Sequence, residues 1–378
     1  MIFARLSVVV SLSLLACLPA QVVVYVSHDE EHSRRILDLF ESESGIEVRA
    51  TYDTEATKTV GLVQRIIAEA SSPVADVFWN NECGQTELLK ERGLLQAYRS
   101  PVAKTIPAHL KDTEGWWTGF AARSRVLVWN TTMVTEAELP RRLEDLTAPK
   151  FKGRIAVAKP LTGTTLTHVA ALYTVWGEER TNKWLDGMMA NDVLWDSGNG
   201  PVADKVGDGV RPFGLTDTDD VNVRRLGNKP VRAFFLDQED GGLGSFVIPN
   251  SVMILKDAPH VDNARKLVDF LLSPRVEKLL AEGEAAQMPL QPGVAVPEHV
   301  TPVDELQTMD VDFASVGEAL DERTQDLHDR FARVQGGKVI EGETGVAALI
   351  WALLALVLAG VFVYLAVKPS GGGASQGS

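Results

Sequence analysis

Three polar clusters follow predicted strands in the first part of the chain. They are Ser27-His28-Asp29, Asp53-Thr54-Glu55 and Asn80-Asn81-Glu82. Their imidazole, carboxylate and amide groups suit a metal ion or a polar solute, and ligands of open α/β sheets bind at the carboxyl ends of the strands. Asp29, Thr54 and Asn81 equally suit the capping of the helices that follow. The convergence of three such clusters favours a binding site.

Polar turns between residues 159 and 220 offer a second set of ligands. The candidates are Thr162, Gly163, Thr164, Asn199, Thr216, Asp217, Thr218 and Asp219. Hydroxyls and backbone N–H groups at a helix start suit an oxyanion or a carboxylate, whereas carboxylates suit a hard cation or an amine. Residues of these types also build turns by bonding their own backbone. Ligand binding and a purely structural role both remain open for these turns.

The motifs of common enzymes and nucleotide sites are absent from the body of the chain. Residues 22–345 contain none of the enzyme and cofactor motifs GxSxG, HExxH, GxGxxG and CxxC. The turn at residues 159–165 lacks the GK[ST] ending of a nucleotide loop. The DTDD run at 217–220 lacks the glycine and the distal glutamate of an EF-hand. The 37 Lys and Arg against 51 Asp and Glu give a net charge of -14, which argues against a basic face that grips nucleic acid. We therefore expect a binding protein without catalysis and without a nucleic-acid partner.

Strands and helices alternate along the body of the chain. Strands are predicted at residues 22–26, 46–51, 75–79, 125–129, 154–158, 231–236, 245–248 and 252–255, and helices at 30–44, 55–71, 166–176, 263–272, 275–282 and 312–333. This alternation implies an α/β fold with a parallel sheet. Because residues 22–345 exceed the usual size of one hydrophobic core, we expect two lobes.

Both ends of the chain are apolar. Residues 1–20 contain one charge, Arg5, and an apolar run, which is typical of a secretory signal. An uncleaved anchor, or a lipoprotein signal in which Cys17 carries the lipid, is the alternative. Residues 346–367 carry no charge and would form about 33 Å of helix, enough to cross a bilayer. A linker at 334–345 precedes this predicted span, and a Gly/Ser tail at 368–378 follows it. We expect an extracytoplasmic body anchored at its C-terminal end.

Several runs resemble one family of transport proteins. They are VVVYVSHDEEHSRRILDLFESESGIEVRATYDTEATKTVGLVQRIIAEASSPVADVFWNNE, EDLTAPKFKGRIAVAKP, FGLTDTDD, VIPNSVMILKDAPH and ARKLVDFLLSP. In order and length they resemble the extracellular solute-binding proteins of bacterial ABC importers, family 1, in the ferric-iron-binding group. The resemblance implies the two-lobed type II periplasmic-binding-protein fold, with lobe 1 at residues 21–120 and about 237–310, lobe 2 at 121–236 and a C-terminal helix at 311–333. It also implies a monomer that closes over a small ligand or metal ion and presents it to an ABC permease.

The resemblance further implies a ligand set for Fe(III) as transported cargo, with no resident cofactor. Ferric-binding relatives use a His after the first strand, a Glu after the third and two adjacent Tyr in the second lobe, with an anion completing the shell. The matching positions are His28, or Asp29 in strict register, and Asn81-Glu82. Asp217 and Asp219 stand where the Tyr pair is expected. An organic cation, an aminophosphonate, thiamine or a polyamine is the alternative ligand, held by the residues named above. A ligand sensor is the alternative role.

Overall fold

The chain passes between two groups of strands through two long strands, β5 (Thr118–Asn130) and β10 (Val247–Leu255). The computed structural model describes residues 20–53, 59–332, 334–335 and 338–339. Its main sheet has the order β2-β1-β3-β10-β5-β8-β6-β7, with β4 beside β10 and β9 beside β5. The outer strands are parallel, but β10 is antiparallel to both β3 and β5. The sheet is therefore mixed, which corrects the prediction of a parallel sheet.

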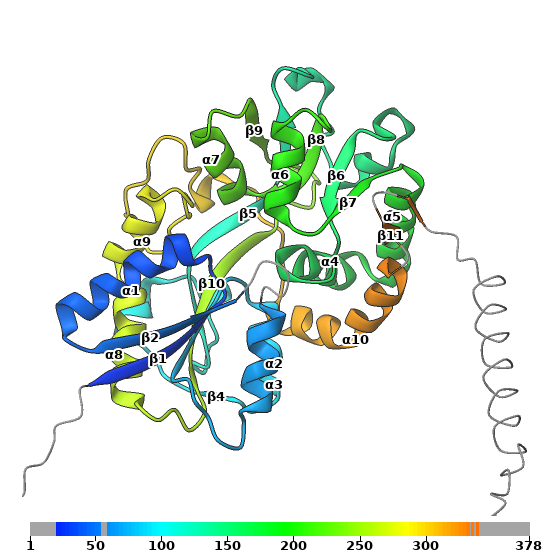
Figure 1. Ribbon diagram of the computed structural model, residues 1–378. Helices are drawn as coiled ribbons and strands as arrows, with labels where there is room; N and C mark the ends of the chain where they lie inside the picture. Colours follow the sequence, from blue (N-terminus) through cyan, green and yellow to red (C-terminus); the bar gives the residue numbers. More distant parts are fainter. Residues whose placement is uncertain (1–19, 54–58, 333, 336–337, 340–378) are drawn as a thin grey trace, which may run out of the picture.

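Lobe 1 contains the strands on the β3 side of this crossing and the helices that cover them (Figure 1). Its elements are β1 (Gln21–Val26), β2 (Glu47–Tyr52), β3 (Val77–Asn80), β4 (Leu95–Gln96), α1 (Glu30–Ser44), α2 (Val60–Ala68), α3 (Gly84–Glu91), α8 (Val261–Leu271) and α9 (Pro274–Glu282). The valine-rich β1 lies between β2 and β3, where such residues pack well. Helix α1 buries Ile36, Leu37 and Phe40 on one face and stops at Gly45, whose φ of 69° is left-handed.

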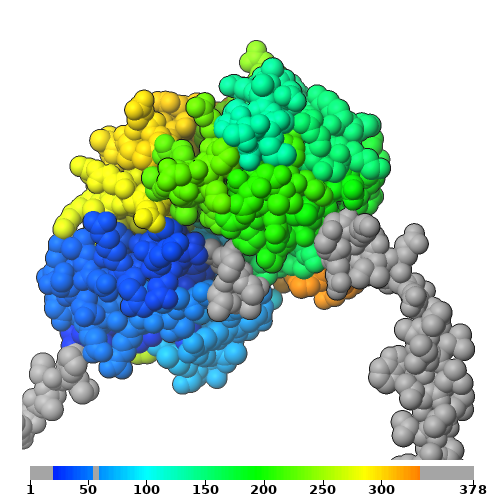
Figure 2. Space-filling view, turned by 45° about the horizontal axis from the view of Figure 1, so that its top comes forward, coloured from blue at the N-terminus to red at the C-terminus, as the bar shows by residue number. Residues whose placement is uncertain are grey.

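Lobe 2 lies on the other side of the crossing. Its elements are β6 (Ile155–Ala158), β7 (Leu194–Asp196), β8 (Phe213–Asp217), β9 (Val231–Phe234), α4 (Gly163–Trp176), α5 (Glu178–Ala190), α6 (Asn199–Gly207) and α7 (Thr218–Leu226). Strand β6 is parallel to β7 and β8, so their carboxyl ends meet at one edge. In the space-filling view of Figure 2, the blue residues of lobe 1 face the green residues of lobe 2.

A long helix, α10 (Phe313–Phe331), connects the two lobes on one side. It packs against α3 of lobe 1 and α4 of lobe 2, and its apolar face buries Val316, Leu320 and Leu327. Short 3₁₀ helices occupy Pro101–Thr105, Ala108–Leu110, Glu136–Glu138, Leu143–Thr147, Pro149–Phe151 and Val303–Glu305. Strand β11 (Val334–Gln335) pairs antiparallel with β12 (Lys338–Val339).

Several predicted boundaries differ from the structure. The two strands expected at 245–248 and 252–255 form the single strand β10, because the chain stays extended through Pro249 and Asn250 with only a register shift between them. Helix α4 begins at Gly163 and not at 166, so the polar turn is its first turn. The lobe boundary predicted at residues 120 and 121 falls inside β5.

The predicted terminal segments lie outside the described residues. This holds for the signal at 1–20 apart from Ala20, for the span at 346–367 and for the tail at 368–378. Among the described residues, no helix combines the length and the apolar character needed to cross a membrane.

Candidate functional site

A cleft with a volume of about 250 Å³ lies between the two lobes at the carboxyl ends of the strands. The lining residues come from lobe 1, from the crossing strand β5 and from lobe 2. They are His28, Asp29, Glu31, Asn81, Arg123, Ala158, Lys159, Thr162, Gly163, Thr164, Thr165, Ser197, Gly198, Asn199, Gly200, Pro201, Asp217, Asp219, Asp220 and Arg224. A ligand in this cleft would contact both lobes at once.

Three helices of lobe 2 begin at the cleft without a side-chain cap. The N-cap residues of α4, α6 and α7 are Thr162, Gly198 and Asp217, and none of their side chains caps its helix. Gly163 adopts a φ of 58°, a left-handed conformation that favours glycine and turns the chain into α4. Uncapped helix starts carry backbone N–H donors and the positive end of the helix dipole. The starts of α4 and α6 favour a negatively charged ligand group, whereas the first turn of α7 already carries Asp219 and Asp220.

Asp217 is buried against two arginines of β5. Its Oδ1 lies 2.8 Å from Arg125 Nη1, and its Oδ2 lies 3.3 Å from Arg123 Nε. Thr164 Oγ1 donates to Oδ2 at 2.6 Å, and Asn199 Nδ2 donates to it at 3.2 Å. Burial alone would raise the pKa of Asp217, but the charges of Arg125 and Arg123 outweigh it and hold the pKa below its ordinary value. Asp217 is therefore a charged carboxylate that organises lobe 2.

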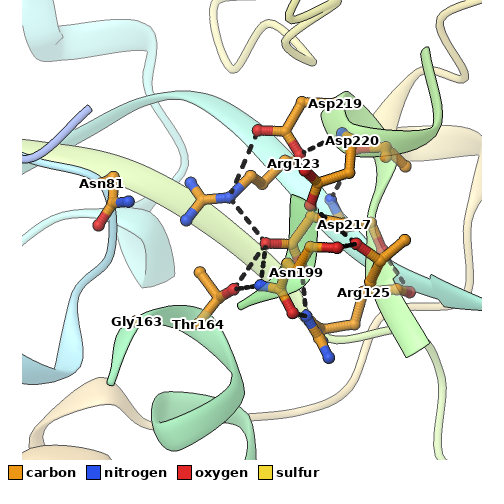
Figure 3. A network of polar contacts seen from close by, with 12 residues as sticks. Asn81, Arg123, Arg125, Gly163, Thr164, Asn199, Asp217, Asp219 and Asp220 are labelled. Carbon is orange, nitrogen blue, oxygen red and sulfur yellow. Dashed lines mark hydrogen bonds and ion pairs between the residues drawn. The ribbon is translucent and has the colours of Figure 1, made fainter. Parts of the chain in front are cut away.

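Arg123 presents part of its guanidinium to the cleft. The residue is 3% exposed, and its ion pairs with Asp217 and Asp219 both run through Nε, at 3.3 and 3.8 Å. Its Nη1 is buried and has no hydrogen-bond partner within the part of the chain that the structure describes. In Figure 3 the two Nη atoms point away from the aspartates and toward Asn81 of lobe 1. This edge of the guanidinium is positioned to donate to a ligand.

Asp217, Asp219 and Asp220 form the acidic wall of the cleft. One oxygen from each lies within 4.8 Å of the others, a spacing that suits a cation. Asp220 accepts a hydrogen bond from Thr216 Oγ1 at 2.8 Å and pairs with Arg224 at 3.5 Å. Burial, together with the negative charges of Asp219 and Asp217, raises the pKa of Asp220 to about 8. Asp220 is thus largely protonated at neutral pH when the cleft is empty of cations.

Glu82 does not belong to the cleft lining. Its carboxylate is fully buried and accepts hydrogen bonds from Gly84 N at 2.6 Å, Gln85 N at 2.9 Å, Asn80 Nδ2 at 3.2 Å and Thr167 Oγ1 at 2.9 Å. Burial raises its pKa. The structure therefore uses Glu82 to hold the first turn of α3 and to contact α4, and does not bring it into the pocket with the other members of the predicted metal set.

The remaining predicted residues divide into two groups. The cleft lining brings together His28, Asp29, Asn81, Thr162, Gly163, Thr164, Asn199, Asp217 and Asp219. The lining does not include Ser27, Thr216 and Thr218, whose hydroxyls bond Asn80, Asp220 and the backbone N–H of Ser124, respectively. Glu55 lies outside the described residues.

Sequence reasoning missed the basic residues of the cleft. Arg123, Lys159 and Arg224 line it, and Arg125 supports it from behind. The sequence does contain a signal for Arg123 and Arg125. In the run GFAARSRVLVW these two arginines stand two residues apart in an otherwise apolar strand. That spacing puts both side chains on one face of the strand, and a buried charge requires a partner.

The comparisons with known proteins agree on one kind of molecule. Residues 72–315 match the family model "Bacterial extracellular solute-binding protein". "Iron uptake protein A1" of Synechocystis sp. is 27% identical over 320 residues, which cover 82% of this chain and 86% of that protein. "Major ferric iron-binding protein" of Neisseria meningitidis is 26% identical over 308 residues, covering 79% and 89%. The crystal structure of iron-bound HitA from Pseudomonas aeruginosa superposes with a TM-score of 0.74 at 25% identity, covering 82% and 99%.

Proposed function

The chain belongs to the bacterial extracellular solute-binding proteins, and from this premise we propose that it captures a small solute between its lobes and delivers it to an ABC permease. The observation that carries the proposal is the cleft itself, because lobe 1, β5 and lobe 2 all contribute to its lining. Two lobes that are connected by the crossing strands β5 and β10 can close on a ligand by a hinge motion. We assign no catalysis to the cleft.

Ferric iron together with an anion is the first cargo to test. It is suggested by relatives named for iron uptake and ferric iron binding. In this chain, His28 and the carboxylates of Asp219 and Asp220 line the cleft and would supply nitrogen and hard oxygen ligands. The anion would sit against Arg123 and the starts of α4 and α6. None of the lining residues is a tyrosine, so carboxylates would have to take the place of phenolates.

The location follows from the same reasoning. A relative from Serratia marcescens is named "Fe(3+)-binding periplasmic protein", and we place this chain on the same side of the membrane.

Residues 346–367 would anchor it there and raise its effective concentration beside the permease. A chain that ends at Glu343 should then bind its ligand with unchanged affinity while uptake by the cell falls. Loss of affinity in the shortened chain would argue against a role in anchoring alone.

Lobe closure is the decisive experiment for solute capture. The experiment uses the full-length protein with Cys17→Ser and places one spin label in each lobe. The labels are attached at Asp38→Cys in α1 and Lys205→Cys in α6, which are both exposed positions, and they report the distance between the lobes. Cys83 is buried and should not react. We expect this distance to shorten when a solute from Fe(III) plus phosphate, Fe(III) plus citrate, or the organic phosphates tested below is added.

A second label pair controls for changes within one lobe. Asp38→Cys with Lys266→Cys in α8 places both labels in lobe 1, and this distance should stay constant. If none of these solutes shortens the distance between the lobes, solute capture by closure is wrong.

A further inference from the structure

We propose that the cargo of this cleft is an organic phosphate monoester, whose phosphoryl group binds Arg123 and the starts of α4 and α6 while its hydroxyl or ammonium groups bind Asp219 and Asp220. The inference rests on the proposed solute-binding function and names the class of solute. It follows from three features of the cleft: a buried guanidinium with an unused edge, two uncapped helix starts, and an acidic wall that already has internal donors.

The unused edge of Arg123 calls for an anionic ligand. Nη1 is buried without a partner among the described residues, although the residue is 3% exposed. A buried donor that lacks an acceptor destabilises the protein, and an oxyanion with several oxygens would supply the missing acceptor. Arginine binds such groups with two parallel hydrogen bonds, and both Nη atoms point toward Asn81 of lobe 1 (Figure 3).

The helix starts supply donors from a second direction. Helix α4 has 14 residues and α6 has 9, and both begin at the cleft without a side-chain cap. Lys159 lies in the same lining, with the hydroxyl-bearing Thr162 and Thr165. The guanidinium and the two helix starts line the same cleft. Donors on several sides of a cleft match a tetrahedral anion better than a planar carboxylate, because a phosphoryl group directs its oxygens to several sides.

The acidic wall is suited to the hydroxyl or ammonium groups of the solute. Asp219 lies 3.4 Å from Gln287 Nε2, and Asp220 pairs with Arg224, so these carboxylates can accept further hydrogen bonds from hydroxyl or ammonium donors. The cleft volume of about 250 Å³ is several times the ~30 Å³ that one water occupies in the liquid. There is space for a phosphate that carries a short polyol or amine.

A bare metal ion fits the same residues less well. Asp217 accepts from Arg125, Arg123, Thr164 and Asn199, so a trivalent cation would have to displace these donors or bind beside two positive charges. Glu82 is held by donors of its own outside the lining.

Titration calorimetry on the full-length protein tests the proposal. The protein is treated with EDTA and titrated with glucose 6-phosphate, glycerol 3-phosphate, O-phosphoethanolamine and inorganic phosphate. We expect at least one ester to bind without metal, at least tenfold more tightly than inorganic phosphate. Binding of Fe(III) with an anion but of no ester would overturn this inference and leave solute capture standing. Failure of every ester and of every Fe(III) mixture to bind or to close the lobes would overturn both.

Variants locate the phosphoryl group. Arg123→Lys keeps the positive charge beside Asp217 but loses the two-point contact, and should weaken ester binding at least tenfold. Asp219→Asn should reduce the preference for the ester over inorganic phosphate, because it removes a carboxylate that would bind the hydroxyl or ammonium group of the ester. Arg225→Met, on the exposed part of α7 outside the cleft, is the matched control and should bind as the parent does. Unchanged ester affinity in folded Arg123→Lys would contradict the assigned position.

Discussion

The Thr167 hydroxyl of α4 donates a hydrogen bond to Glu82 Oε2 at 2.9 Å and so connects lobe 2 to lobe 1. Both residues are buried. A methyl group added to Gly84 would lie within 3.2 Å of Thr167, Glu82 and Leu320, so these side chains meet at one point beside α10. The lobes are therefore joined on the α10 side through a polar contact as well as through β5 and β10. This contact should remain while the cleft opens and closes.

Thr167→Val should destabilise the protein by about 1–3 kcal/mol, because it leaves the buried Glu82 carboxylate with one donor fewer. The free energy of unfolding from urea titration measures the loss. Thr174→Val is the matched control, since that hydroxyl donates to the carbonyl of Ala171 in the same helix and makes no contact of this kind with lobe 1 among the described residues. If Thr167→Val is as stable as the control, the contact between the lobes contributes no stability.

Gly317→Ala should separate α10 from α3. A Cβ at this position would lie 2.7 Å from Glu87 Cβ, closer than carbon atoms approach, and overpacking of this kind costs about 1–3 kcal/mol. Thermal unfolding of the full-length protein should show a lower midpoint. Glu318→Ala, on the exposed side of the same helix, should leave the midpoint nearly unchanged, and an equal effect of the two substitutions would show that the close crossing is not the cause.

Elements that depend on local patterns could be predicted from the sequence. Helix α1 has apolar residues at helical spacing and a glycine stop, and β1 is a run of β-branched residues, so both follow from nearest neighbours along the chain. Strand β10 does not, because a proline usually interrupts a central strand. Here Pro249 is accommodated by a register shift against β5, which only the pairing with another strand reveals.

The candidate site was open to prediction only where its residues follow strands. His28, Asn81 and Asp217 all line the cleft, as the ends of β1, β3 and β8 require. Glu82 follows β3 as well, yet its carboxylate turns back to the first turn of α3, since a buried helix start needs acceptors. The choice between a ligand and a cap depends on side-chain direction, which residue spacing does not give.

Acid should weaken the protein through His168. This residue is buried and stacks on Phe246 at 5.3 Å between ring centroids, and burial, aided by the charge of Arg125, lowers its pKa to about 3. The unfolded chain therefore binds a proton below about pH 6.5 that the folded protein does not bind. The contribution of His168 to the free energy of unfolding is complete above pH 6.5 and is lost as the pH falls toward 3. The free energy of unfolding should fall by about 2 kcal/mol between pH 7 and pH 5.

His168→Phe should remove this part of the pH dependence while keeping the stacked ring. Urea titrations at pH 7, 6 and 5 on the parent and the variant measure the difference. His109→Gln is a control because His109 is exposed. A parent and a His168→Phe variant with parallel pH profiles would contradict a neutral, buried imidazole.

Base should weaken the protein through Asp220. Its folded-state pKa is raised to about 8 by burial and by Asp219 and Asp217, above the value of about 3.9 expected in the unfolded chain. Because the folded protein holds a proton that the unfolded chain has released, the stability contributed by this group is complete below about pH 3.9 and is lost as the pH rises through 8. The loss between pH 7 and pH 9 should be about 1.4 kcal/mol.

Asp220→Asn should remove the contribution of this group to the pH dependence of the free energy of unfolding between pH 7 and pH 9. The amide can still accept the hydrogen bond from Thr216 Oγ1, and it does not ionise in this range. Urea titration of the ligand-free protein at pH 7, 8 and 9 measures the effect. Asp208→Asn removes an exposed carboxylate that pairs with Lys229, so it should shift all three values equally and keep the slope of the parent. A parent whose stability does not fall over this range would show that Asp220 is ionised at neutral pH. The acidic wall would then carry one more negative charge, which favours an ammonium group over a hydroxyl as its partner.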